Sequence, residues 1–310
     1  MAPRLNRESK NKQTGPGPYC NHWSNPRLQD PAPINPERVR ILIMRIYVCV
    51  KHVPDTAANI KIVSDTGYDK EVKYVPIFYD EYGVEEAVSL VEKKGQGEII
   101  AVCVGNESSV NSLKSVMAMG VHRSILVKTE EQLLDSARTS KALAKAIAQD
   151  RADKPDEADK PDEPADLIFM GKQSVDSEGM QTPYRLGAEL GLPVVTGVVD
   201  FSMEGALARV QREIGGGARE TSTIKMPCII GATKGLNEPR FPKLPAILKA
   251  KKKEIKVIDI STLEIADDSQ YRLKNLEPVE ERSNATILEG STQEIVDSLV
   301  KILREEEKVI

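Results

Sequence analysis

The stretch Arg45-Ile-Tyr-Val-Cys-Val-Lys51 decides the fold. It is a short, continuous apolar run rich in Ile and Val, typical of a strand that is buried on both faces of a sheet. Similar runs follow at 98–104, 124–128 and 166–170, and stretches with apolar residues at helical spacing, such as 84–91, separate them. This strand–helix–strand order predicts an α/β fold with a mostly parallel sheet and right-handed crossovers.

The pattern changes at two places inside this region. Residues 60–75, with a turn at Asp65-Thr-Gly67, predict a hairpin. After residue 193, alternating segments joined by glycine-bearing turns predict an antiparallel extension of the sheet. The end of the chain, 295–307, has apolar residues at helical spacing and predicts an amphipathic helix on a C-terminal arm. We therefore expect a main domain over 44–260 and an arm over 261–310.

Residues 1–43 differ in composition from the rest of the chain. They hold seven of the 19 prolines, and they carry seven Lys and Arg against three Asp and Glu. No helical or strand periodicity is present, which predicts a disordered tail. We expect sequence upstream of the native start, with Met44 as the true N-terminus; a transit peptide and a native disordered arm are the alternatives.

A second anomaly is a tandem six-residue repeat, Ala152-Asp-Lys-Pro-Asp-Glu157 followed by Ala158-Asp-Lys-Pro-Asp-Glu163. Charged, proline-bearing repeats of this kind do not bury apolar surface. The repeat predicts a solvated loop, inserted over 151–164 between a helix and a strand.

Composition excludes several classes of protein. A formal net charge of −4 and an aromatic content of 4% argue against a nucleic-acid-binding surface. No run of about 18 apolar residues exists, so no membrane-spanning segment is expected. The four cysteines are isolated and form no CxxC pair, which predicts a reduced, cytosolic protein without a zinc ribbon.

The segment Gly171-Lys-Gln-Ser-Val-Asp-Ser-Glu-Gly-Met-Gln-Thr182 follows a predicted strand and leads into a helix. Thr182 is a good N-cap and Pro183 a good first helical residue. The loop brings glycines and free backbone N–H groups to a helix N-terminus, which favours an anion such as a phosphate. Asp176 and Glu178 could accept hydrogen bonds from a sugar or a base. A helix-capping loop that binds nothing remains the alternative, because neither a Walker A motif nor GxGxxG is present.

No catalytic constellation stands out. His52 follows a strand, and we expect a histidine hydrogen-bonded at the strand end rather than a catalytic one. The basic run Lys249-Ala-Lys-Lys-Lys253 predicts a solvated helix end that the helix dipole favours, with an anionic partner surface as the alternative.

From Met44 onward the chain resembles the beta subunit of electron-transfer flavoproteins. The most specific block is Gly235-Leu-Asn-Glu-Pro-Arg-Phe-Pro-Lys-Leu-Pro245, which leads to the basic run that ends at Lys253. Shorter blocks add to it: Val48-Cys-Val-Lys-His52, Val84-Glu-Glu-Ala87, Met117-Ala-Met-Gly120, Gly171-Lys-Gln173 with Gln181-Thr182, and Val210-Gln-Arg-Glu-Ile214.

The resemblance implies a Rossmann-like domain, similar to the adenine-nucleotide alpha-hydrolase fold, in a heterodimer with an alpha subunit. It implies a redox-active FAD held largely by the alpha subunit, and a buried AMP, or in electron-bifurcating members a second FAD, held by this chain. The implied role is that of an electron carrier and not of an enzyme. Electrons would pass from acyl-CoA or similar dehydrogenases, as in fatty acid beta-oxidation, to a membrane quinone oxidoreductase. The compartment would be the bacterial cytoplasm, or the mitochondrial matrix in a eukaryote.

The family's nucleotide contacts map onto four segments of this chain. Its partner contacts map onto one strand residue and one loop. Glu213 is expected to pair with an Arg of the alpha subunit, and Leu236, at an exposed loop tip, to anchor a dehydrogenase; the alternative is that Leu236 folds back into its own core. The nucleotide-binding residues are Cys49, Ile77, Phe78, Tyr79, Asp80, Val104, Gly171, Lys172, Gln173, Ser174, Val175, Asp176, Ser177, Glu178, Gly179, Met180, Gln181 and Thr182; the partner-binding residues are Glu213, Leu236, Asn237, Glu238, Pro239 and Arg240.

The chain departs from the family pattern at two places. Many relatives have Asn-Pro-Phe or Asn-Pro-Tyr where this chain has Ile77-Phe-Tyr-Asp80, so an amide donor is missing and Asp80 is expected to take over part of its role. Residues 176–179 match neither the AMP-type nor the bifurcating pattern. The block over 235–253 favours AMP over a second FAD. A nucleotide-binding stress-response module and an adenylating enzyme are rival interpretations; the extension after 194 and the segment Lys51-His-Val-Pro-Asp55 argue against them.

Overall fold

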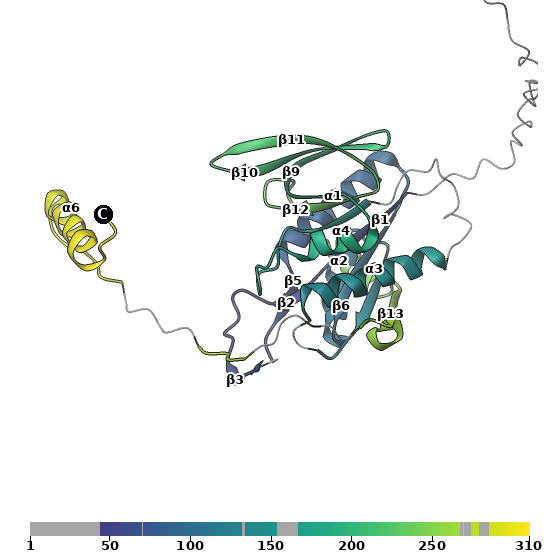
Figure 1. The fold of residues 1–310 in the computed structure, drawn as a ribbon, viewed down its shortest axis with the longest axis horizontal. Coiled ribbons are helices and arrows are strands. Elements are labelled where there is room, and N and C mark those ends of the chain that lie inside the picture. Colours follow the sequence, from purple (N-terminus) through teal and green to yellow (C-terminus); the bar gives the residue numbers. More distant parts are fainter. Residues whose placement is uncertain are drawn as a thin grey trace, which may run out of the picture. The chain divides into compact units, whose positions relative to one another are not determined.

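The computed structural model describes residues 44–69, 71–131, 134–153, 167–266, 269, 274–278 and 285–310. The predictions for 1–43, and for most of the repeat over 152–163, lie outside these residues. The described part contains a nine-stranded sheet in the order β11-β10-β9-β12-β8-β1-β6-β7-β13 (Figure 1). Its strands are β1 (Arg45–Cys49), β6 (Glu98–Gly105), β7 (Arg123–Lys128), β8 (Leu167–Gly171), β9 (Val194–Glu204), β10 (Leu207–Gly215), β11 (Ala218–Lys225), β12 (Cys228–Ala232) and β13 (Ile255–Asp259).

The predicted α/β class is confirmed. All neighbouring pairs from β9 to β13 across the sheet are parallel, and β9, β10 and β11 form the predicted antiparallel extension. The expected hairpin is present as β3 (Ile62–Ser64) and β4 (Gly67–Tyr68), and a second short pair joins β2 (His52–Pro54) to β5 (Tyr74–Pro76). Strand β13 was not among the predicted strands.

Helices cover both faces of the sheet. One face packs against α1 (Phe78–Lys94), α2 (Val110–Met119) and α5 (Leu244–Ala250); the other packs against α3 (Ser136–Ala152) and α4 (Thr182–Leu190). Side chains of β1 alternate between the two cores: Ile46 and Val48 lie in the first, Tyr47 and Cys49 in the second. Because all four are almost fully buried, β1 is the central strand that the sequence predicts.

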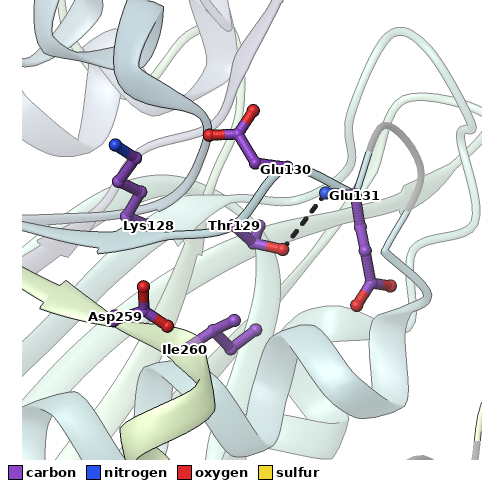
Figure 2. Close-up of a pocket in the computed structure, with 6 residues that line it drawn as sticks. All are labelled: Lys128, Thr129, Glu130, Glu131, Asp259 and Ile260. Atoms are coloured by element: carbon purple, nitrogen blue, oxygen red, sulfur yellow. Dashed lines mark hydrogen bonds between the residues drawn. The ribbon is translucent and has the colours of Figure 1, made fainter.

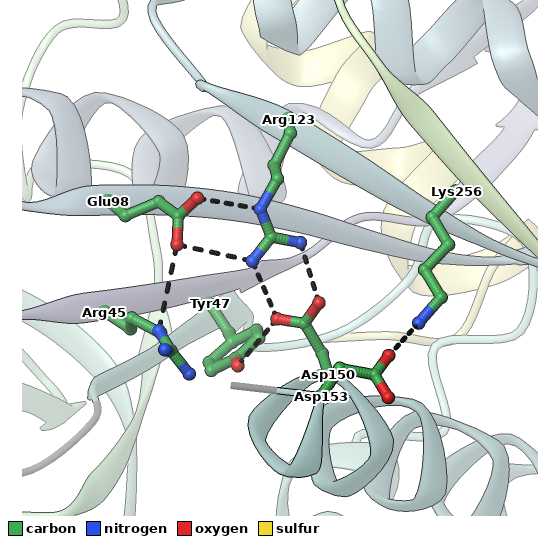
Figure 3. Close-up of polar contacts among 7 residues, drawn as sticks. All are labelled: Arg45, Tyr47, Glu98, Arg123, Asp150, Asp153 and Lys256. Carbon is green, nitrogen blue, oxygen red and sulfur yellow. Dashed lines mark hydrogen bonds and ion pairs between the residues drawn. The ribbon is translucent and has the colours of Figure 1, made fainter. Parts of the chain in front are cut away.

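The amino ends of the central strands carry an ion cluster (Figure 3). Arg123 at the start of β7 donates to Glu98 at the start of β6 and, through two nitrogens, to Asp150 on α3. The hydroxyl of Tyr47 donates to the same Asp150, and Nε of Arg45 lies 3.8 Å from a carboxylate oxygen of Glu98. This cluster ties two strands to the helix that covers them.

The arm contains α6 (Thr292–Lys301), followed by a π-helical turn over 302–306. A capping box between Ser291 and Glu294 starts the helix, and Val296 and Leu299 are exposed. In the described part of the chain, no helix combines the length and apolarity needed to cross a bilayer.

Candidate functional site

The candidate site lies where the strand order reverses. The chain passes from β1 to β6 on one side, whereas β8, the neighbour of β1 on the other side, comes much later in the sequence. In doubly wound sheets, ligands bind in the crevice outside the carboxyl ends of the strands at such a switch point. The predicted segments around Cys49, 77–80, Val104 and 171–182 follow or border these strand ends.

Asp80, in the first turn of α1, bonds to the ends of both strands at this switch point. One of its carboxylate oxygens accepts the backbone N–H of Lys51 after β1, and the other accepts the backbone N–H of Gly171 at the end of β8, each at 2.7 Å. The side chain is buried, and burial raises the pKa of Asp80 to about 7 against the two amide donors and the charge of Lys51. Asp80 thus lies at the start of the loop over 171–182, and its expected role in nucleotide binding stays a prediction.

The side chain of Lys51 reaches from the end of β1 to the loop over 171–182. Its ammonium donates to both carboxylate oxygens of Asp176, at 2.6 and 2.8 Å. Burial alone would raise the pKa of Asp176, but the charge and hydrogen bonds of Lys51 outweigh it and hold the pKa below its usual value. A second cation is Lys172, whose ammonium nitrogen lies 5.2 Å from the ring centroid of Tyr79. Lys51 was missing from the predicted site; the signal for it is a lysine directly after the first strand.

The backbone of the loop over 171–182 is folded tightly. The amide of Glu178 donates to the carbonyl of Ser174, and both Glu178 and Met180 have positive φ, at 48° and 54°. Non-glycine residues rarely adopt positive φ, because it strains the backbone. Residues with strained backbone are found more often at functional sites than elsewhere. The expected N-cap was wrong: α4 begins at Thr182, and Gln181 occupies the N-cap position without a side-chain cap.

The other predicted nucleotide-binding residues differ in exposure. The side chains of Cys49 and Ile77 are buried in the protein, Val104 is half-buried, and Phe78 is exposed. Burial also raises the pKa of the Cys49 thiol far above its usual value, so this thiol stays protonated. A ligand at this edge would meet the backbone at Cys49 rather than its side chain.

His52 matches the expectation of a hydrogen-bonded histidine at a strand end. Its two ring nitrogens lie 2.7 Å from the hydroxyl of Ser112 and 3.0 Å from that of Ser108, and the ring stacks on Tyr74. Burial lowers the pKa of His52 to about 4, so the ring is neutral near pH 7.

A shallow pocket of about 440 Å³ lies at the same edge of the sheet, at the carboxyl ends of β7 and β13 (Figure 2). Lys128, Asp259 and two glutamates give it mixed charge, and Lys128 is paired with Glu107 outside the pocket. The lining holds one lysine and three carboxylates, an excess of negative charge that does not suit a phosphate, and the pocket is two strands away from the switch point.

The predicted partner-binding residues fall into two groups. Glu213 is exposed on β10, opposite Arg219 on β11. Leu236 is half-buried and packs against the first core, which is the alternative that the sequence left open for it. Asn237 donates to the carbonyl of Tyr82 and to Glu86, so it fastens its loop to α1.

Arg240 fastens the same loop at a second point. Its guanidinium pairs with Glu85 and Glu92 of α1, at 2.8 and 2.7 Å. These carboxylates raise the pKa of Arg240 further above its usual range. Pro239 is half-buried and Glu238 exposed. Asn237 and Arg240 therefore hold the loop in place from within the chain.

The basic run at the end of α5 is not uniformly solvated. Lys253 donates from its ammonium to the carbonyls of Met117 and Val121, at the end of α2. Burial, together with the charge of Lys249, lowers the pKa of Lys253. Lys253 thus caps the C-terminus of a neighbouring helix, whereas Lys251 and Lys252 are exposed.

Comparison with known proteins decides the family. A family model described as "Electron transfer flavoprotein domain" matches residues 70–263. "Electron transfer flavoprotein subunit beta" of Bacillus subtilis (strain 168) is 31% identical over 270 residues, which cover 86% of this chain and all of the relative. The chain belongs to the electron-transfer flavoprotein beta-subunit family. The Homo sapiens subunit is 35% identical over 84% of this chain and 98% of the relative, and the Arabidopsis thaliana subunit, described as mitochondrial, is 33% identical over 83% and 97%.

Proposed function

We propose that this electron-transfer flavoprotein beta subunit holds an adenine nucleotide, AMP, in the crevice between β1 and β8, within a heterodimer with an alpha subunit. The observation that carries the proposal is the convergence of Lys51, the first turn of α1 and the loop over 171–182 at the switch point. Lys51 and Lys172 supply positive charge for a phosphate, and α4 begins at the end of the loop.

The loop leaves room for such a ligand. A Cβ atom added at Gly179 would meet nothing within 4 Å, although Gly179 lies between two residues with positive φ. The backbone of the loop is therefore open to an approaching molecule on this side. Asp176 and Glu178 supply acceptors for ribose or base donors.

The proposed role is electron transfer, without bond-making chemistry by this chain. FAD, shared with the alpha subunit, supplies one-electron redox chemistry when bound, and the protein supplies placement and electrostatics. We propose acyl-CoA dehydrogenase-type proteins as donors and a membrane quinone oxidoreductase as acceptor. The exposed Glu213 would pair with an arginine of the alpha subunit, and the exposed apolar side of α6 on the arm would contact the same subunit.

Extraction of the purified heterodimer, followed by mass spectrometry of the released nucleotides, tests the proposal. One AMP and one FAD per heterodimer are expected. If two FAD and no AMP are released, the site holds the second flavin of an electron-bifurcating protein. If one FAD is the only adenine nucleotide released, the proposed site is refuted.

Gly179→Val locates the site. Because a Cβ atom at this position meets no protein atom within 4 Å, the variant should keep the wild-type melting temperature of the nucleotide-free protein. It should lose AMP if the nucleotide lies against the loop, and the holoprotein should then melt earlier, since a ligand of the folded state stabilises by mass action. Wild-type AMP content in this variant would place the nucleotide elsewhere.

We propose that the dehydrogenase docks on the apolar residues that follow the fastened loop. Phe241 is 96% exposed and Leu244 69% exposed, whereas Leu236 packs against the core. Exposed apolar side chains that gather next to a firmly held loop mark a protein–protein interaction surface. Leu244→Ala should weaken dehydrogenase coupling at an unchanged melting temperature, and Leu236→Ala should lower the melting temperature. Unchanged coupling in both Leu244→Ala and Phe241→Ala would refute this surface.

A further inference from the structure

Asp80 connects three pieces of chain that meet at the switch point. Its carboxylate joins the amide of Lys51 to the amide of Gly171, and the amide of Ile77 donates to the carbonyl of Lys51. The first turn of α1 is thus bonded to the ends of both β1 and β8.

The fit around this carboxylate is tight. A Cβ atom at Gly171 would lie 2.7 Å from the Asp80 carboxylate and 2.7 Å from Cβ of Tyr79. Residue 171 must therefore be glycine for the amide to reach the carboxylate, and the loop over 171–182 begins at the point that Asp80 holds. At its other side Lys51, whose amide is held by Asp80, contacts Asp176 in the middle of the loop.

The carboxylate of Asp80 does not stabilise the fold in its charged form. Burial disfavours its charged form more than the two amides and Lys51 favour it, because the pKa is raised from 3.8 to about 7. Between pH values of about 4 and 7, the folded state therefore binds more protons at Asp80 than the unfolded state does. The free energy of unfolding consequently falls as the pH rises through this range and Asp80 ionises. Perturbed carboxylates in clefts are typical of functional sites.

We propose that Asp80 is a positioning residue: its carboxylate fixes the loop over 171–182 against the end of β1 and so sets the place of Lys51 for the phosphate of an adenine nucleotide. This inference rests on the proposed function. It assigns Asp80 no contact with the nucleotide, since Asp80 is 4% exposed and its two carboxylate oxygens accept protein amides.

Few other groups near Asp80 can produce the same pH dependence. Lys51 and Glu81 act on it electrostatically, and the thiols of Cys49 and Cys103 are close enough to feel its charge. Burial raises the pKa of both thiols, that of Cys103 to about 12, so they stay protonated. Burial also raises the pKa of Glu81, which makes Glu81→Gln the matched control.

The test measures the AMP dissociation constant of the full chain, complexed with its alpha subunit and freed of nucleotide, from roughly pH 5.5 to 8.5, which brackets the pKa of Asp80. Wild type, Asp80→Asn and Glu81→Gln are compared. An asparagine presents an N–H donor to one of the two amides, so Asp80→Asn should weaken AMP binding about tenfold or more at pH 8. Asp80→Ser, which keeps one acceptor, gives a second variant.

The pH profile separates positioning from a purely structural role. The AMP phosphate itself titrates near pH 6, as phosphate monoesters do, so the diagnostic is the ratio of wild-type to Asp80→Asn affinity. This ratio should fall toward one as the pH drops through about 7, and Glu81→Gln should follow wild type. A constant ratio, or a lower melting temperature with unchanged affinity, would overturn the inference. A wild type that does not bind AMP would instead refute the proposed site.

Discussion

Removal of one carboxylate from the ion cluster at the amino ends of the strands gives a sharp test of the fold. Asp150 is 4% exposed and accepts hydrogen bonds from two nitrogens of Arg123 and from the hydroxyl of Tyr47 (Figure 3). Asp150→Asn removes the charge and turns an amide N–H toward the guanidinium. Breaking a buried ion pair by removing one partner costs about 3–5 kcal/mol.

Asp153→Asn is the matched control. Asp153 lies one turn further along the same chain segment and pairs with Lys256 at 2.6 Å, but the two side chains are 57% and 30% exposed. An exposed pair contributes about 0–1 kcal/mol. The two substitutions therefore make the same chemical change and differ only in burial and in the number of donors.

The pH dependence of the effect has a definite sign. Burial alone would raise the pKa of Asp150, but the hydrogen bonds and charge of Arg123 outweigh it and hold the pKa below 3.8. Stability from this group is thus fully present above the unfolded-state pKa and is lost as the pH falls through the lower, folded-state value. The difference between wild type and Asp150→Asn should shrink below about pH 4.

Urea denaturation followed by far-ultraviolet circular dichroism measures the free energy of unfolding of all three proteins. Asp150→Asn should lose several times more stability than Asp153→Asn at pH 7. Equal losses would show that burial and the Arg123 contacts do not govern the cluster. A difference that persists unchanged at acid pH would refute the assigned protonation state.

Three further changes have definite expected outcomes. Met180→Asn should raise the free energy of unfolding by about 1 kcal/mol, since asparagine tolerates the positive φ at this position better; denaturation that shows no gain would argue against strain there. Lys253→Met should cost about 1–2 kcal/mol, because the carbonyls of Met117 and Val121 lose their donor; an unchanged midpoint in urea would count against it. Gly187→Ala should lower the melting temperature, since its Cβ would lie 2.2 Å from the Val194 side chain.

The central strands could be predicted because they are buried on both faces. Continuous apolar runs such as Arg45–Cys49 have no other stable place in a protein of this size. Strand β13 was missed because it lies at the edge of the sheet, where Val257 is 52% exposed and the charged Lys256 and Asp259 interrupt the apolar residues. An edge strand needs no continuous apolar run, and therefore leaves a weaker signal.

The sequence predicted which segments form the candidate site, but it did not predict which side chains contact one another there. The strand ends place Asp80 and the loop over 171–182 at one edge of the sheet, whichever side chains they carry. The pairing of Lys51 with Asp176, 125 residues away, depends on side-chain directions that periodicity does not report. For the same reason Leu236 was expected at an exposed loop tip, whereas the turn directs it toward the core.

The ion cluster and the proposed nucleotide site lie at opposite ends of the same strands. Strand β1, five residues long, separates them by about 16 Å. Effects of substitutions farther apart than about 10 Å, without shared partners, usually add. Substitutions that strengthen the ion cluster should therefore offset the stability lost through substitutions around Asp80 and Gly179. The strands act as a spacer, so residues around the proposed nucleotide site can be exchanged without changing the ion cluster that holds α3 to the sheet.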